Sequence, residues 1–97
     1  MGSLQKNLVT FKIMLMEKNN PLQDKQFLID LAHTRMPYGK YKGSFLIDLP
    51  EHYIVWYHAK GFPKGKIGMM LGLVYELKLN GLEYLIHTIK EGTKETI

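Results

Sequence analysis

The predicted fold is built around residues 35–43, which read RMPYGKYKG. Pro37 fixes its own backbone φ and pushes Met36 towards an extended conformation, and the two glycines permit turns that a side chain would obstruct. The segment therefore predicts a short strand, a tight turn and a second strand over residues 44–49. We expect helices from the rest of the chain to cover this two-stranded β-hairpin.

The same turn is a candidate anion site. A glycine-rich turn can aim successive backbone N–H groups at one point, and Lys40 and Lys42 add positive charge beside Gly39 and Gly43. This combination suits a phosphate group. The spacing is not that of a nucleotide-binding P-loop, and such pairs also occur in solvated hairpin turns. An anion site and an ordinary turn both stay open.

Positive charge is concentrated in the middle of the chain. Residues 35–66 hold six basic and two acidic side chains, which account for the whole formal net charge of +4. The basic residues Arg35, Lys40, Lys42, Lys60, Lys64 and Lys66 are interleaved with the aromatic residues Tyr38, Tyr41, Tyr53, Trp56, Tyr57 and Phe62. Cations among aromatic rings are typical of nucleic-acid surfaces. The alternative is a solvated basic face without a ligand.

Several short motifs follow one another in an order that resembles one bacterial family. They are MPYGKYKG (36–43), LIDLPE (46–51), Tyr53, Trp56, GFPKGK (61–66), VYE (74–76) and NGLEYL (80–85). The family carries the label "putative quorum-sensing-regulated virulence factor" and is otherwise a domain of unknown function. Tyr38 departs from the usual phenylalanine. A related segment occurs in domains appended to proofreading-type exonucleases, so the resemblance implies proximity to nucleic acid and no known activity.

Four segments are predicted to be helical. Asn20, Pro21 and Gln23 form a helix start, and this first helix extends to His33. Residues 50–60, 67–79 and 82–91 form the other three, with glycines at the ends of the first two of these. Glycines 68 and 72 lie inside the segment 67–79, which we interpret as close packing of another element against that face.

We expect a single domain. Ninety-seven residues, of which 45% are apolar, suffice for one compact core and not for two. Residues 1–19 are expected to be an N-terminal extension, residues 20–91 the domain and residues 92–97 a frayed tail. The extension fits a helix or a strand, and Met14 and Met16 are alternative translation starts. The predicted fold class is α+β and mostly helical, with a short two-stranded β-hairpin packed by three to five helices.

The single tryptophan has two interpretations. Residues 53–59 carry more apolar positions than one narrow helical stripe needs. We expect Trp56, the largest side chain, to lie in the core. The alternative leaves Trp56 or Tyr57 facing a ligand or a partner.

Catalytic, metal-binding and membrane-spanning patterns are not recognisable. The chain has no cysteine, which excludes disulfides and thiolate metal sites. Neither serine lies in a nucleophile elbow, and no metal-ligand spacing relates the histidines His33, His52, His58 and His87. No apolar run is long enough to cross a bilayer. We therefore expect a cytoplasmic protein that is not an enzyme, with no cofactor, metal or membrane contact.

The leading hypothesis is a small accessory module that binds DNA or RNA without catalysis. The expected contact residues are Tyr38, Gly39, Lys40, Tyr41, Lys42, Gly43, Lys60, Lys64 and Lys66, with Trp56 and Phe62 as further aromatic contacts. The alternative is a protein-interaction adaptor, in which the loop and an exposed aromatic side chain dock on a nuclease or another protein.

Overall fold

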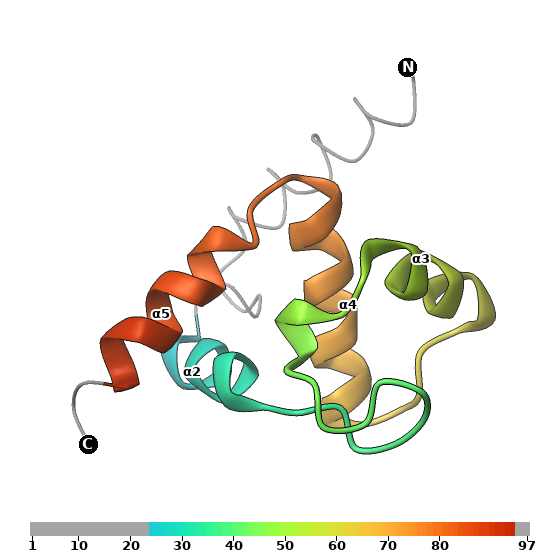
Figure 1. Cartoon of the computed structure of the whole chain (residues 1–97), viewed down its shortest axis with the longest axis horizontal. Helices are drawn as coiled ribbons and strands as arrows, with labels where there is room; N and C mark the ends of the chain where they lie inside the picture. Colours follow the sequence, from blue (N-terminus) through green and yellow to red (C-terminus); the bar gives the residue numbers. More distant parts are fainter. Residues whose placement is uncertain (1–23, 95–97) are drawn as a thin grey trace.

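The computed structural model describes residues 24–94 as four α-helices and one turn of 3-10 helix. These elements are α2 (Lys25–His33), η2 (Leu46–Asp48), α3 (Glu51–Lys60), α4 (Lys66–Leu79) and α5 (Tyr84–Lys94). Helix α4 lies in the middle, with the packed pair α2 and α5 on one side and α3 on the other (Figure 1). The turn η2 contacts both α2 and α4. Within residues 24–94, no helix is long and apolar enough to span a bilayer.

The predicted two-stranded β-hairpin, and with it the α+β class, is wrong. Among the described residues, β-pairing is limited to one isolated antiparallel bridge between Arg35 and Phe45. A backbone hydrogen bond from Met36 N to Ser44 O, 2.7 Å long, flanks this bridge. The two segments therefore meet as expected, but they do not continue as strands.

The pairing ends because the second segment turns into η2. A strand would direct Leu46 and Ile47 to opposite faces, yet both side chains are fully buried, as is Leu49. A turn of 3-10 helix lets adjacent side chains enter one core, because it rotates each residue by about a third of a turn. The fold is thus all helical in its described part.

The core forms where η2 fills the space between α2 and α4. Its buried side chains come from every described helix. They include Leu31 and Ala32 from α2, Leu46, Ile47 and Leu49 in and after η2, Ile54 from α3, Leu71, Val74 and Leu77 from α4, and Ile86 from α5. Each fully buried leucine or isoleucine stabilises the fold by about 1.5–3 kcal/mol relative to an exposed one.

Helix α2 begins later than the sequence pattern predicts. The Asp24 carboxylate caps it by accepting a hydrogen bond from Phe27 N at 3.0 Å, which satisfies one of the free N–H groups of the first turn. The predicted start at Asn20, Pro21 and Gln23 lies outside the described residues. So do the predicted extension of residues 1–19, with its two alternative translation starts, and residues 95–97 of the predicted tail.

The prediction that glycines end α3 and α4 is confirmed. Gly61 ends α3 with a φ of 99°. Gly81 follows α4 with a φ of 66°, and Leu82 N donates to Leu77 O at 2.8 Å, the pattern of a Schellman motif. Helix α5 continues to Lys94, beyond the predicted end at Glu91.

The two glycines inside α4 have different surroundings. A Cβ on Gly68 would overlap the carbonyl oxygen of Pro63 in the connector from α3. Close packing at Gly68 is therefore confirmed. At Gly72 a Cβ would meet nothing within 4 Å, so the same prediction is wrong for this residue.

Alanine substitutions at these two positions should shift stability in opposite directions. Gly68→Ala should lower the free energy of unfolding by about 1–3 kcal/mol, because the connector must move away from α4. Gly72→Ala should raise it by about 0.5–1 kcal/mol, because alanine restricts the unfolded chain and meets no obstacle. Thermal denaturation of both variants checks this. Equal shifts of Tm would contradict the packing of the connector on Gly68.

Candidate functional site

The loop of residues 37–43 is closed by backbone hydrogen bonds. Gly43 N donates to Met36 O at 2.8 Å, and Lys42 N donates to Gly39 O at 3.2 Å. Gly39 and Gly43 have φ values of 82° and 91°, a region that residues with a Cβ rarely adopt. The predicted use of both glycines for turns is confirmed.

The tip of this loop presents unpaired amides. The backbone N–H groups of Tyr38, Gly39, Lys40 and Tyr41 have no hydrogen-bond partner among residues 24–94. Successive free N–H groups beside lysine side chains are a suitable setting for an anion. The amides of Lys42 and the following glycine are used inside the loop instead.

The loop packs against the aromatic face of α3. The Tyr41 ring packs edge-on against Tyr53, with 4.7 Å between the ring centroids. The Tyr38 and Tyr57 hydroxyl oxygens lie 3.1 Å apart. We call six of the connected rings the aromatic cluster: Tyr38, Tyr41, Tyr53, Trp56, Tyr57 and Phe62.

Trp56 lies on the surface of this cluster. Its side chain is 53% exposed, and that of Tyr38 is 43% exposed. The expectation that Trp56 belongs to the core is wrong, because α3 buries only Ile54 fully and packs mainly on α4. The loop covers α3 at Tyr53 and Tyr57, which leaves the indole of Trp56 open to solvent.

Two of the predicted cations lie beside these rings. Lys40 Nζ lies 5.5 Å from the Tyr41 ring centroid, and Lys60 Nζ lies 5.8 Å from the Trp56 ring centroid. Both distances suit a cation–π contact. Lys42 is exposed in the same loop.

The remaining predicted residues divide into two groups. Phe62 packs on Tyr57 with 5.3 Å between centroids, and Lys64 follows it, exposed, in the connector to α4. Lys66 lies apart from the aromatic cluster, because its Nζ forms an ion pair with Asp30 Oδ2 at 2.9 Å. The structure thus joins every predicted site residue except Lys64 and Lys66 to the loop or the cluster.

Two cations outside the predicted site residues lie over the ring of Phe45, two residues after the loop. The Arg35 guanidinium lies 4.1 Å from the Phe45 ring centroid, and Lys90 Nζ lies 3.1 Å from the same centroid. Arg35 also donates to Gly43 O at 2.8 Å. Arg35 was visible as part of the basic middle segment. No local signal identifies Lys90, because it comes from α5.

Two phenols of the cluster, those of Tyr53 and Tyr57, have raised pKa values. The hydrogen bond to Tyr38, together with partial burial, raises the pKa of Tyr57 to about 12. Burial, and then the neighbouring phenols of Tyr38 and Tyr41, raise the pKa of Tyr53. Neither of these two phenols therefore contributes a negative charge near neutral pH.

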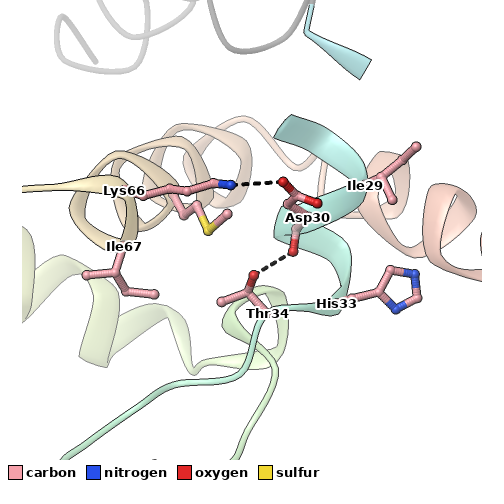
Figure 2. Close-up of a pocket in the computed structure, with 7 residues that line it drawn as sticks. Ile29, Asp30, His33, Thr34, Lys66 and Ile67 are labelled. Atoms are coloured by element: carbon pink, nitrogen blue, oxygen red, sulfur yellow. Dashed lines mark hydrogen bonds and ion pairs between the residues drawn. The ribbon is translucent and has the colours of Figure 1, made fainter. Parts of the chain in front are cut away.

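A separate shallow pocket lies between α2 and the start of α4 (Figure 2). Its volume is about 600 Å³. The ion pair of Lys66 with Asp30 crosses it, and the hydrogen bonds from Lys66 and Gln26 lower the pKa of the Asp30 carboxyl. The His33 ring points away from Asp30 (Figure 2), and its Nε2 lies 2.7 Å from Thr93 Oγ1. Among the described residues, no three acidic or histidine side chains are placed to hold a metal ion.

Removal of one hydroxyl should reveal the contact between the loop and α3. In Tyr38→Phe, the pKa of Tyr57 should fall from about 12 towards the ordinary tyrosine value of 10.0, because the neutral phenol loses its partner. The raised pKa of Tyr57 adds to the free energy of unfolding. This contribution is fully present below pH 10 and is lost as pH rises through about 12. NMR titration of tyrosine labelled at Cζ measures it. Tyr84→Phe, on the exposed face of α5, is the matched control. An unchanged pKa of Tyr57 in Tyr38→Phe would contradict the contact between the two hydroxyl groups.

Comparison with known proteins covers the same part of the chain that the structure describes. A family model matches residues 24–89. "Uncharacterized protein YpeB" of Escherichia coli strain K12 is 46% identical over 68 residues, which cover 69% of this chain and 94% of that protein. The protein of the same name from Escherichia coli O157:H7 matches equally. No solved structure matches significantly. The chain therefore belongs to the bacterial family described as "Putative quorum-sensing-regulated virulence factor".

Proposed function

We propose that this protein binds nucleic acid through the phosphate backbone and catalyses no reaction. The observation that carries the proposal is the docking of the loop 37–43 on the aromatic face of α3. This docking brings Lys40 and Lys60 to the two ends of one row of ring contacts, Tyr41 to Tyr53 to Trp56. Cations and rings on one surface are what a nucleic-acid strand requires, since it offers phosphates and bases together.

Uncompensated charge supports the proposal. Lys66 and Lys78 are the lysines of residues 24–94 that lie within ion-pair distance of a carboxylate. Lys40, Lys42 and Lys60 have no such carboxylate in that part of the chain. An anionic strand would therefore replace mobile counterions rather than break protein ion pairs, and release of those counterions favours binding.

The polar groups of this surface support a binding role more than a catalytic one. Lysine ammonium groups and a phenol with a pKa of about 12 are poor acids or bases near neutral pH. His33 and Asp30 lie in the other pocket and do not face one another (Figure 2). The names of the matching proteins state no ligand.

Removal of the loop lysines should weaken binding in a salt-dependent manner. Fluorescence anisotropy with labelled DNA and RNA should show affinity that falls steeply as salt rises. In the double variant Lys40→Ala with Lys42→Ala, the slope of log K against log salt should shrink by about 1.4–1.8, because two phosphate contacts are lost. The fold should be unchanged by far-UV circular dichroism, because both side chains extend from a surface loop.

A matched pair of lysine variants separates the effect of the position of a lysine from the effect of its charge. Lys25→Ala, at the exposed start of α2, and Lys42→Ala remove one charge each. We expect the Lys42 variant to lose more affinity than the Lys25 variant. No binding of any nucleic acid at low salt would reject the proposed function, and equal losses would reject the loop as its site.

A protein-interaction adaptor is the second candidate. The observation that favours it is the exposure of Val55 (42%) next to Trp56 on α3, because tryptophan beside an apolar side chain is typical of binding hot spots. This function predicts a complex that resists salt and is lost in both Trp56→Ala and Phe62→Ala. Pull-down with the purified protein at low and high salt distinguishes it from nucleic-acid binding.

A further inference from the structure

We propose that this surface selects single-stranded over double-stranded nucleic acid, because bases stack on the exposed rings of Trp56 and Tyr38. The inference rests on the proposed function and names its ligand class. It depends on the placement of these two exposed rings, which a surface that bound phosphates by charge alone would not need.

The two exposed rings are neighbours in space. Tyr57 connects them, since its hydroxyl oxygen lies 3.1 Å from that of Tyr38 and its ring centroid lies 6.0 Å from that of Trp56. Trp56 belongs to α3, and Tyr38 belongs to the loop. One short strand can therefore reach both rings without a change in the fold.

The Trp56 ring is held in place before any ligand arrives. It stacks on Tyr53 with an interplanar angle of 27°, and Tyr53 is held in turn by the edge of Tyr41. The Tyr53 hydroxyl lies 3.7 Å from where a Cβ of Gly39 would be, so the loop closes over it. A ring fixed in this way loses little conformational freedom on binding, which favours affinity.

A single strand matches this arrangement and a duplex does not. The base faces of a duplex are stacked on each other, so a protein reaches only the base edges and the phosphates. A single strand can turn its bases onto aromatic rings while its phosphates contact lysines. Lys40 Nζ and Lys60 Nζ lie over the rings of Tyr41 and Trp56, 5.5 Å and 5.8 Å from their centroids. A base that stacks on Trp56 displaces the exposed Lys60 side chain, whose ammonium group then meets the neighbouring phosphate.

The full chain contains a built-in reporter, because Trp56 is its one tryptophan. An oligothymidylate of about 16 nucleotides and a duplex of equal length are titrated at the same salt concentration. Trp56 fluorescence and the anisotropy of the labelled oligonucleotide are recorded together. We expect the single strand to quench Trp56 and to bind about tenfold more tightly than the duplex.

Trp56→Ala tests stacking separately from charge. It should weaken single-strand binding about tenfold or more, because one stacked base is lost. The salt slope should stay at the wild-type value, because no cation is removed. Trp56→Phe should restore most of the affinity, since it keeps a ring. Tyr84→Ala on α5, which removes a ring that is 58% exposed, is the matched control and should bind as the wild type does.

The outcomes distinguish this inference from the proposed function. Binding of neither oligonucleotide at low salt rejects both the inference and the proposed function. Salt-dependent binding of strand and duplex with equal affinity leaves the proposed function and overturns the preference for single strands. Tight binding of the strand without quenching of Trp56, or equal losses in Trp56→Ala and Tyr84→Ala, likewise overturns it.

Discussion

Burial of the adjacent side chains Leu46 and Ile47 is the constraint on which the rest of the structure depends. Both enter the core between α2 and α4, and only a tight helical turn can direct two successive residues there. The turn ends the pairing that begins at the bridge of Arg35 with Phe45. Residues 37–43 therefore form a loop rather than the tip of a longer hairpin, and this loop can lean on α3. The surface that we assign to nucleic acid follows from how the core is filled.

A buried lysine fixes the position of this turn. Lys78 comes from α4, its side chain is 7% exposed, and its Nζ donates to Ile47 O at 2.8 Å. Glu83 Oε2 lies 3.8 Å from the same nitrogen. A buried ammonium group is costly unless it has partners, so displacement of η2 would leave this charge without its carbonyl. The lysine thereby ties the turn to α4 more specifically than apolar packing can, because leucine side chains tolerate small shifts.

Local signals in the sequence predicted the helices, whereas the features that require distant contacts could not be predicted. Gly61 and Gly81 end helices through their own backbone conformation, which neighbouring residues determine. The hairpin failed because the alternation of residues 44–49 is broken at Leu46 and Ile47, a departure that only the positions of α2 and α4 explain. Trp56 was misplaced for a related reason. Its exposure depends on how much of α3 the loop covers, and Lys90 reaches the ring of Phe45 only through the docking of α5.

The ends of the loop, more than its tip, determine what the site can recognise. Met36, which precedes the loop, is fully buried. At the end of the loop, the backbone N–H of Gly43 donates a hydrogen bond to Met36 O. The tip between them carries unpaired amides and lysines, while its tyrosines are held by rings of α3. A loop with anchored ends and a braced middle presents its charges at fixed positions relative to Trp56. Under the proposed function, the spacing between cations and rings would discriminate among anionic polymers, which a flexible basic tail of the same net charge could not do.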